Sequence, residues 1–565
     1  MQRLKNTLLR TLLASATGAT LLLPQASAQG GTGAGVGVST SAQAPARDQG
    51  CMPALPMPPK DPSVDFDWSC SHWGNFNWNG VNGRVFWPSD CQSGGAPSSE
   101  LRLPLILIMH GDGQAYTDYD SIAHHLSANG FIVASIANSG TNVQRASKAK
   151  TYLDFLRDSW GYKDWVDSTN VGLIGHSRGG EAVLTVARLN QSQGWGYDVN
   201  AIISLAPTDN QEGGGIPENL AGSSSHALLV IYGTHDEDVT GYCVTGGLPE
   251  CGTPLVSARS SGFALYDRAG SEGSTEPFPL EDEVVDKTLL YIEGANHNSW
   301  LSTCSGNPPL GQLSCYTHTD LAKGYMNAFM RWKLRGMEIY QNYFNGNMKL
   351  PEAIRENVVV HTSHQKGYDR RVVDNFEQPG FLFNSIGGLN WRENTVTIEK
   401  DGSTWDYEPT SPHDTRSATV SWAPPGLVPY VRFDIPDSAT QFGGRSRDIT
   451  RFDFLSLRAG QVYGSAYNTP GQDKDFYVQL VDSHGFESNR VRVSEFAKLP
   501  YPKPVQVLKY GQFIMVTASP MKTIRIPNCR FLGVDRRNIS SVKLSMNVTG
   551  STLGELFLDN IEFTD

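Results

Sequence analysis

The sequence predicts a doubly wound, mostly parallel α/β sheet followed by an all-β sandwich of the jelly-roll type. Short apolar runs alternate with helix-compatible stretches up to about residue 335, which is typical of buried parallel strands joined by helices. Beyond about Asn345 the strands become short and alternate apolar with polar residues, as in sandwiches. A chain of 565 residues is also too long for one hydrophobic core.

The start of the chain predicts export. Three basic residues, Arg3, Lys5 and Arg10, precede the apolar stretch 12–23 and then Ala26-Ser27-Ala28, as in a secretory signal peptide. The apolar stretch is too short to span a membrane, and so is every other one. We therefore expect a signal peptide at 1–28, a flexible Gly/Ser-rich linker at 29–50 and a secreted or periplasmic protein.

The α/β domain is expected at 51–345. Its strands are the most continuous apolar runs of the chain, and a helix with apolar residues at helical spacing closes it at about Tyr316 to Leu334. The expected strands are Leu103–Met109, Val171–Ile174, Ala201–Leu205, Ala227–Tyr232 and Thr288–Ile292.

The sandwich is expected at 373–565, after a linker at 346–372. Its expected strands include Ala418–Trp422, Tyr430–Ile435, Phe452–Leu457, Phe476–Val481, Thr523–Ile526, Val542–Val548 and Leu556–Phe563. Four aromatic residues are candidates for stacking on sugars, although aromatics in a sandwich are more often core. They are Trp405, Tyr407, Trp422 and Tyr430.

Ser177 is the candidate nucleophile. It stands in Gly175-His176-Ser177-Arg178-Gly179, between an apolar strand and a helix-compatible stretch. A serine on such a sharp turn needs neighbours without side chains, so that the backbone can fold tightly and Oγ can stand clear. The five-residue pattern by itself is weak, because a glycine-rich chain produces it by chance, so its context decides.

The chain supplies an acid and a base after Ser177, in the order that this turn requires. Asp236 follows the strand Ala227–Tyr232, and His297 follows the strand Thr288–Ile292. Asp238, on the same loop as Asp236, is the runner-up acid. Asp209, after the preceding strand, is the second alternative.

The turn His110-Gly111-Asp112-Gly113 follows the most apolar strand of the mature chain. It is the expected place for one of two backbone amides that stabilise an oxyanion. We expect these amides to be those of Asp112 and Arg178. Their side chains flank one site, so they could pair with each other or with an anionic acyl group. The alternative is that Arg178 pairs with Glu181 along the helix.

The region from Leu103 to about Arg335, which contains these motifs, resembles α/β-hydrolases. This group includes cutinase-like polyester hydrolases, chlorophyllases and platelet-activating-factor acetylhydrolases. The matching blocks are HGDG, ANGFIVASI, GHSRGG, YGTHDEDV and GANHNSW. The resemblance implies a serine esterase with Ser177, Asp236 and His297 as nucleophile, acid and base. Polyester hydrolases usually carry an aromatic residue in place of Asp112 and a methionine in place of Arg178. The block from Ser541 to the end is loosely similar to carbohydrate-binding modules, which implies docking on a glycan or polymer surface.

Composition and net charge limit the kinds of molecule that the protein is expected to bind. The net charge of −11 and the lack of a basic run in the mature chain argue against nucleic acid. No metal-binding or phosphate-binding motif is present, and the expected chemistry needs no cofactor. Eight cysteines in an exported chain predict disulfides. Cys243 with Cys251, and Cys304 with Cys315, are plausible local pairs, whereas the pairing of Cys51, Cys70, Cys91 and Cys529 stays open.

Two functions follow from these observations. In the first, the protein is a secreted serine esterase acting on esters, including polymer- or glycan-linked ones. In the second, it is a glycan- or surface-binding protein whose hydrolase fold is inactive or secondary. The complete set of candidates in the required order favours the first.

Overall fold

The computed structural model describes residues 57–565 with gaps at 65–66, 69, 90–101, 209–225, 240–242, 246–260, 270–285, 302–307, 368–369, 378–379, 394–395, 401–411, 414, 424–427, 438–446, 510–511, 547 and 549. Residues 50–565 belong to one compact unit. The expected signal peptide and the linker at 29–50 lie outside the described residues.

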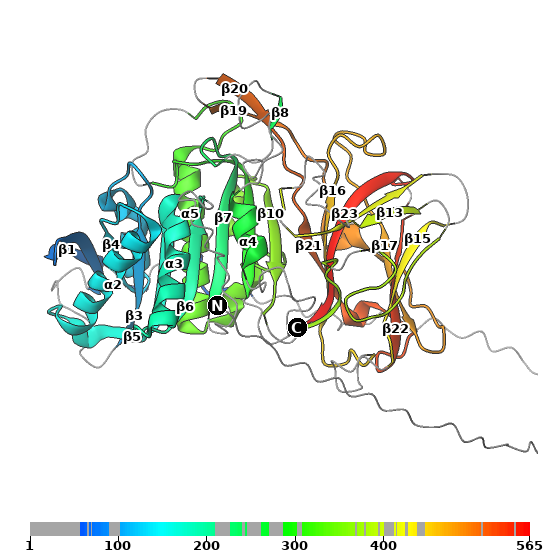
Figure 1. Ribbon diagram of the computed structural model, residues 1–565, viewed down its shortest axis with the longest axis horizontal. Coiled ribbons are helices and arrows are strands. Elements are labelled where there is room, and N and C mark those ends of the chain that lie inside the picture. The colour runs from blue at the N-terminus through cyan, green and yellow to red at the C-terminus, as the bar shows by residue number, and fades with distance from the viewer. Residues whose placement is uncertain are drawn as a thin grey trace, which may run out of the picture. The chain divides into compact units, whose positions relative to one another are not determined.

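A large, mostly parallel sheet organises the first part of the chain (Figure 1). Its parallel strands lie in the order β4-β3-β5-β6-β7-β9, with β1 and β2 added at one edge and β10 at the other, all three antiparallel to their neighbours. The predicted parallel sheet is therefore confirmed. The bounds are β1 Cys70–Trp78, β2 Val81–Ser89, β3 Leu103–Met109, β4 Ile132–Ile136, β5 Val166–His176, β6 Val199–Leu205, β7 Ala227–His235, β9 Lys287–Asn296 and β10 Val360–Gln365.

Helices cover both faces of this sheet. The apolar residues of α2 (Asn142–Asp158), α3 (Arg178–Gln193) and α4 (Ser261–Arg268) join the core on one face. Those of α1 (Asp120–Ala128) and α5 (Cys315–Arg335) join the core on the other. The helix expected at 316–334 is α5, and its predicted core residues are buried; they are Leu321, Tyr325, Ala328, Phe329 and Trp332. Short 3-10 helices lie at Tyr116–Tyr119 (η1), Lys163–Trp165 (η2) and Glu338–Tyr343 (η5).

The stretch 346–372, which we expected to be a linker, contains regular structure. It includes α6 (Pro351–Arg355) and β10, and β10 pairs with β9. These residues therefore extend the parallel sheet by one antiparallel strand before the chain enters β11 (Arg370–Asp374).

Two antiparallel sheets follow and share one apolar core. One has the order β13-β14-β23-β16-β21, with β11 also paired to β23, and the other has the order β12-β15-β22-β17-β18. All seven strands predicted in this region are present. The bounds are β12 Asn390–Glu393, β13 Val396–Lys400, β14 Ala418–Trp422, β15 Tyr430–Asp434, β16 Phe454–Gln461, β17 Tyr477–Asp482, β18 Val491–Arg492, η7 Val493–Glu495, β21 Lys522–Pro527, η8 Asn528–Arg530, β22 Ile539–Ser545 and β23 Gly554–Thr564.

The aromatic candidates for sugar stacking fare differently. Trp422 is only 1% exposed and its Nε1 donates to the carbonyl of Ser551 at 3.0 Å, so the stacking role considered for it is wrong and it belongs to the core. Tyr430 is half-buried, with the Lys543 ammonium 4.4 Å from its ring centroid. Trp405 and Tyr407 lie outside the described residues.

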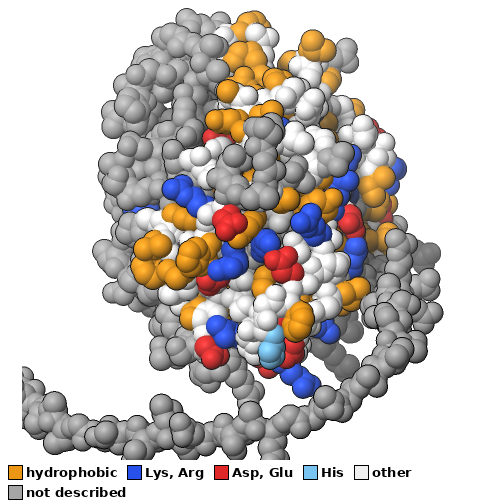
Figure 2. All heavy atoms as spheres, turned by 90° about the vertical axis from the view of Figure 1, so that its right-hand side faces the viewer, with side chains coloured by type: hydrophobic (Ala, Val, Ile, Leu, Met, Phe, Trp, Pro, Cys, Tyr) orange, Lys and Arg blue, Asp and Glu red, His pale blue; other side chains and the backbone are white. Residues whose placement is uncertain are grey.

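The side of the molecule near β15 and β22 carries side chains of mixed type. Figure 2 shows basic, acidic and apolar groups interspersed there, without a continuous basic area.

A small third sheet links distant parts of the chain. The hairpin of β19 (Val505–Lys509) and β20 (Gln512–Val516) pairs through β20 with β8 (Cys243–Thr245), which follows the Asp236 loop in sequence. The C-terminal part of the chain therefore reaches the segment between the candidate acid and the candidate base. Nothing in the sequence pattern predicted this contact.

No helix among the described residues is long and apolar enough to cross a membrane. Cys70, Cys315 and Cys529 are each disulfide-bonded. The two predicted local pairs involve Cys251 and Cys304, which lie outside the described residues.

Candidate active site

Ser177 occupies a strained turn between β5 and α3. Its backbone has φ 54° and ψ −122°, a conformation that costs free energy in a residue other than glycine. A Cβ at Gly175 would lie 2.1 Å from the carbonyl oxygen of Gly179, and a Cβ at Gly179 would lie 2.2 Å from that of Met109. Both glycines of the motif are therefore required by close backbone approach, as the sequence predicted.

The turn after β3 lies directly against the serine. A Cβ at Gly111 would be 3.0 Å from the Cβ of Ser177. Arg178 is the first residue of α3, so its amide has no acceptor within the helix. The Asp112 amide donates to no other described residue. The two amides predicted for an oxyanion hole are thus both free of backbone partners within the described part of the chain.

Asp236 and His297 form a buried pair. The carboxylate oxygens lie 2.9 and 3.0 Å from His297 Nδ1, and both residues are 2% exposed. The backbone amides of Asp238 and Val239 donate to Asp236 Oδ1 at 3.1 and 2.9 Å. The acid is therefore held by its own loop at the end of β7, and the histidine follows the adjacent strand β9.

Asp238, the runner-up acid, takes a different position. Its Oδ2 lies 3.5 Å from His297 Nε2, and its side chain is 59% exposed. Nε2 is the nitrogen that must face the serine, and Ser177 Oγ forms no hydrogen bond to it among the described contacts. Catalytic hydrogen bonds often tighten only when substrate is bound. Asp209, the second alternative, lies outside the described residues.

Electrostatics favour the charged form of His297. Burial by itself would lower its pKa, but the charges of Asp236, Asp238 and Glu237 and the hydrogen bond from Asp236 outweigh burial and raise the pKa above its ordinary value. Burial and the nearby Asp236 raise the pKa of the Glu237 carboxyl. The surroundings therefore stabilise an imidazolium, which is the state that a general base reaches when it takes a proton.

His176 connects the serine turn to the histidine loop. Its Nε2 lies 2.9 Å from the carbonyl oxygen of His297, and its Nδ1 lies 2.7 Å from the Tyr119 hydroxyl. Complete burial lowers the pKa of His176 well below its ordinary value, so the ring is neutral and Nε2 donates to the carbonyl. Gln114 adds a second link, because its Nε2 donates to Asn298 Oδ1 at 3.1 Å.

The sequence did not predict a role for His176, Tyr119 or Gln114. His176 stands inside the serine motif, but its partner lies 121 residues away in the chain. A local sequence pattern does not predict a contact over such a distance. The position of a histidine beside a nucleophile also does not by itself indicate a role.

The side chains of Asp112 and Arg178 form an ion pair, which is one of the two arrangements that we expected. Arg178 Nη1 lies 3.6 Å from Asp112 Oδ2, and the buried Arg145 donates to Asp112 Oδ1 at 3.3 Å. Glu181 instead accepts hydrogen bonds from Asn142 and Thr208, so the expected alternative partner of Arg178 is wrong. Two guanidinium groups therefore share one carboxylate beside the serine turn.

No group of three or more His, Cys, Asp or Glu side chains that could hold a metal ion occurs among the described residues. Comparison with protein-family models gave no match to the chain, and comparison with curated proteins gave none either.

Proposed function

We propose that the protein is an exported serine hydrolase of the α/β-hydrolase fold that cleaves carboxylic esters through an acyl-enzyme intermediate. The observation that supports it best is the buried Asp236–His297 pair, at 2.9 Å, on loops that follow the adjacent strands β7 and β9 of the same sheet whose strand β5 leads into Ser177. A serine at positive φ next to two unpartnered amides adds to that support. The disulfide bonds of Cys70, Cys315 and Cys529 agree with an oxidising compartment.

In the first half of the reaction, Ser177 Oγ attacks the carbonyl carbon of the ester and His297 Nε2 takes its proton. Asp236 holds the ring with Nδ1 protonated and stabilises the imidazolium that forms. The developing oxyanion accepts hydrogen bonds from the amides of Asp112 and Arg178. The intermediate collapses, His297 returns the proton to the leaving oxygen, and an alcohol departs from the acyl-serine.

In the second half, water attacks the acyl carbon while His297 Nε2 takes a proton from it. The second intermediate expels Ser177 Oγ, which regains that proton. The net reaction consumes one ester and one water and releases one alcohol and one acid. All groups that move protons belong to the chain, and the strained turn holds Oγ in place to attack in the first half and to leave in the second.

The test is hydrolysis of p-nitrophenyl esters of increasing acyl length by the mature protein, with Ser177→Ala as the control. We expect activity that the control lacks, and a chain-length optimum that reports the depth of the acyl pocket. Mass spectrometry after treatment with a fluorophosphonate should show one adduct on Ser177. Equal activity of wild type and Ser177→Ala would rule out Ser177 as the nucleophile.

The substrates that we propose include esters carried by a polymer or glycan, positioned by the β-sheet part of the chain. A comparison of soluble and polymer-bound esters tests this point. Free glycan added as a competitor should lower the rate on the polymer only. If neither the wild type nor Ser177→Ala hydrolyses any ester but the wild type still binds glycans, the binding function replaces the enzyme as the better account.

A further inference from the structure

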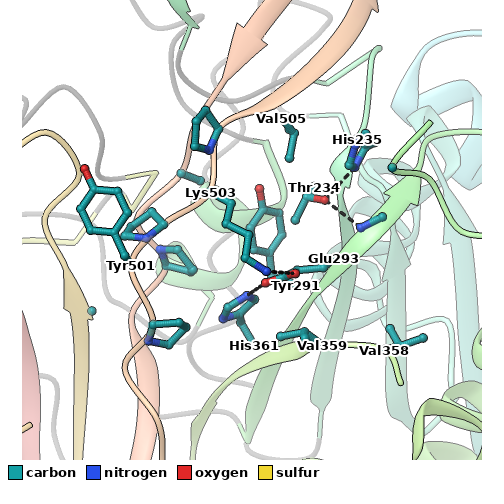
Figure 3. A pocket seen from close by; sticks show the side chains of 18 of the residues that line it. Thr234, His235, Tyr291, Glu293, Val358, Val359, His361, Tyr501, Lys503 and Val505 are labelled. Atoms are coloured by element: carbon teal, nitrogen blue, oxygen red, sulfur yellow. Dashed lines mark hydrogen bonds and ion pairs between the residues drawn. The ribbon is translucent and has the colours of Figure 1, made fainter. Parts of the chain in front are cut away.

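A cavity of about 460 Å³ lies beside the catalytic loops but apart from the triad (Figure 3). One wall comes from the ends of β7, β9 and β10, and the opposite wall comes from the segments 499–506 and 518–522 of the C-terminal part. Ser177, Asp236 and His297 do not line it. Its volume is within the range of pockets that bind small organic molecules.

The charged groups of this cavity leave a positive charge uncompensated. Glu293 is its one lining carboxylate among the described residues, and it is already engaged by Lys503 Nζ at 3.0 Å and His361 Nε2 at 3.1 Å. Burial by itself would raise the pKa of Glu293, but these two partners lower it to about 2. Glu293 is therefore a carboxylate whose charge Lys503 balances.

Lys522 supplies the second cation. Its Nζ donates to the carbonyl oxygen of Lys498 at 3.3 Å, and no carboxylate of the described residues lies within ion-pair distance of it. Burial lowers its pKa to about 8, so the amine is mostly charged at neutral pH. A cation that forms no salt bridge with the described residues, inside a partly closed cavity, favours an anionic ligand.

The remaining walls are flat and largely apolar. The segment 499–505 contributes a run of prolines and Tyr501, and β9 contributes Tyr291. Prolines fix φ, so this wall is rigid and loses little entropy when a ligand binds. The Tyr501 hydroxyl accepts a hydrogen bond from the amide of Gly464 at 3.0 Å, which leaves its own proton available as a donor.

We propose that this cavity binds a carboxylate attached to a six-membered ring, with the carboxylate on Lys522 beside the Lys503–Glu293 pair and the ring against the proline wall. Sugar acids and aromatic acids share this chemistry. The site is separate from the proposed esterase site and does not depend on it. It does touch that site indirectly, because the lining residue His235 directly precedes Asp236.

The experiment is titration calorimetry of the full mature chain with D-galacturonate and with benzoate, beside their neutral counterparts galactose and benzamide. We expect at least one acid to bind. Its neutral counterpart should bind at least about tenfold more weakly, because a hydrogen bond to a charged group contributes about that factor in affinity. The acid that binds identifies the ring. Binding of both with equal affinity means that the cavity accepts either kind of ring.

Variants locate the site. Lys503→Gln should weaken binding about tenfold, and Lys503→Glu should abolish it. Lys503 is 68% exposed, so its replacement leaves the fold intact even where the more buried Lys522→Gln does not. Lys163→Gln, on η2, is the control and should bind as wild type does. The proposal is overturned if neither acid binds, if the neutral compounds bind as well as the acids, or if the Lys503 variants bind like the control.

Discussion

Replacing Asp236 and Asp238 by asparagine, one at a time, separates the acid that orients His297 from the one that only lies near it. The two carboxylates contact opposite nitrogens of the same ring, at 2.9 Å from Nδ1 and 3.5 Å from Nε2. Their surroundings also differ, because the Asp236 side chain is 1% exposed and that of Asp238 is 59% exposed. The matched pair of variants therefore changes the same charge in two environments.

Asp236→Asn should reduce kcat by about 10⁴-fold, or about 5.5 kcal/mol at 1.36 kcal/mol per tenfold. The asparagine amide favours the tautomer with the proton on Nε2, and that nitrogen then has no lone pair for the serine proton. The loss falls on kcat rather than on KM, because Asp236 acts on the base and not on the bound ester.

Asp238→Asn should change the rate little at high pH. A unit charge 3.5 Å away contributes about 1.2 kcal/mol in bulk water, and salt screens the charge of the exposed Asp238 further. Because Asp238 helps to raise the pKa of His297, its loss lowers that pKa. Activity requires neutral His297 and is lost as pH falls through its pKa, so the acid limb of the profile should move to lower pH.

The assay is pH-stat titration of ester hydrolysis for the wild type and both variants, with circular dichroism to verify folding. A severe loss in Asp238→Asn with a mild loss in Asp236→Asn would refute the assignment. Severe losses in both folded variants would show that a single orienting acid is the wrong description.

Three further predictions concern the serine turn, Arg178 and the stability of the fold. Gly179→Ala should lower kcat/KM by about a hundredfold, because the new Cβ would lie 2.2 Å from a backbone oxygen of β3 and would displace the serine turn. Gly161 has open space around it, so Gly161→Ala is the control and should match the wild type. Arg178→Ala should raise KM about tenfold more for esters with an acidic acyl group than for neutral ones, and an equal rise for both would remove the idea that Arg178 recognises charge. Arg458→Met should destabilise the chain by about 3–5 kcal/mol in denaturant unfolding, because it removes a buried guanidinium that pairs with two buried carboxylates at 2.9 and 3.5 Å. The half-buried Arg157→Met should cost no more than about 1 kcal/mol.

The sequence was sufficient to place Ser177, Asp236 and His297 each at the end of an apolar strand. That inference was possible because strand burial and glycine requirements are local: a run such as Leu103–Met109 can only be a buried strand, and Gly179 has no room for a Cβ. The structure agrees with these strands to within a few residues and brings Asp236 and His297 together. Whether the three residues act as a catalytic triad stays a prediction for the assays above.

Other features depended on packing between residues that are distant in the chain, and periodicity does not encode those distances. Asp236 and Asp238 are equivalent in sequence, and only the turn made by their backbone amides points the first at Nδ1 and leaves the second in solvent. The partner of Arg178 followed from the approach of the turn after β3, not from helical spacing. The cavity around Lys503 exists because a C-terminal segment lies against the edge of the parallel sheet, a contact set by the tertiary fold alone.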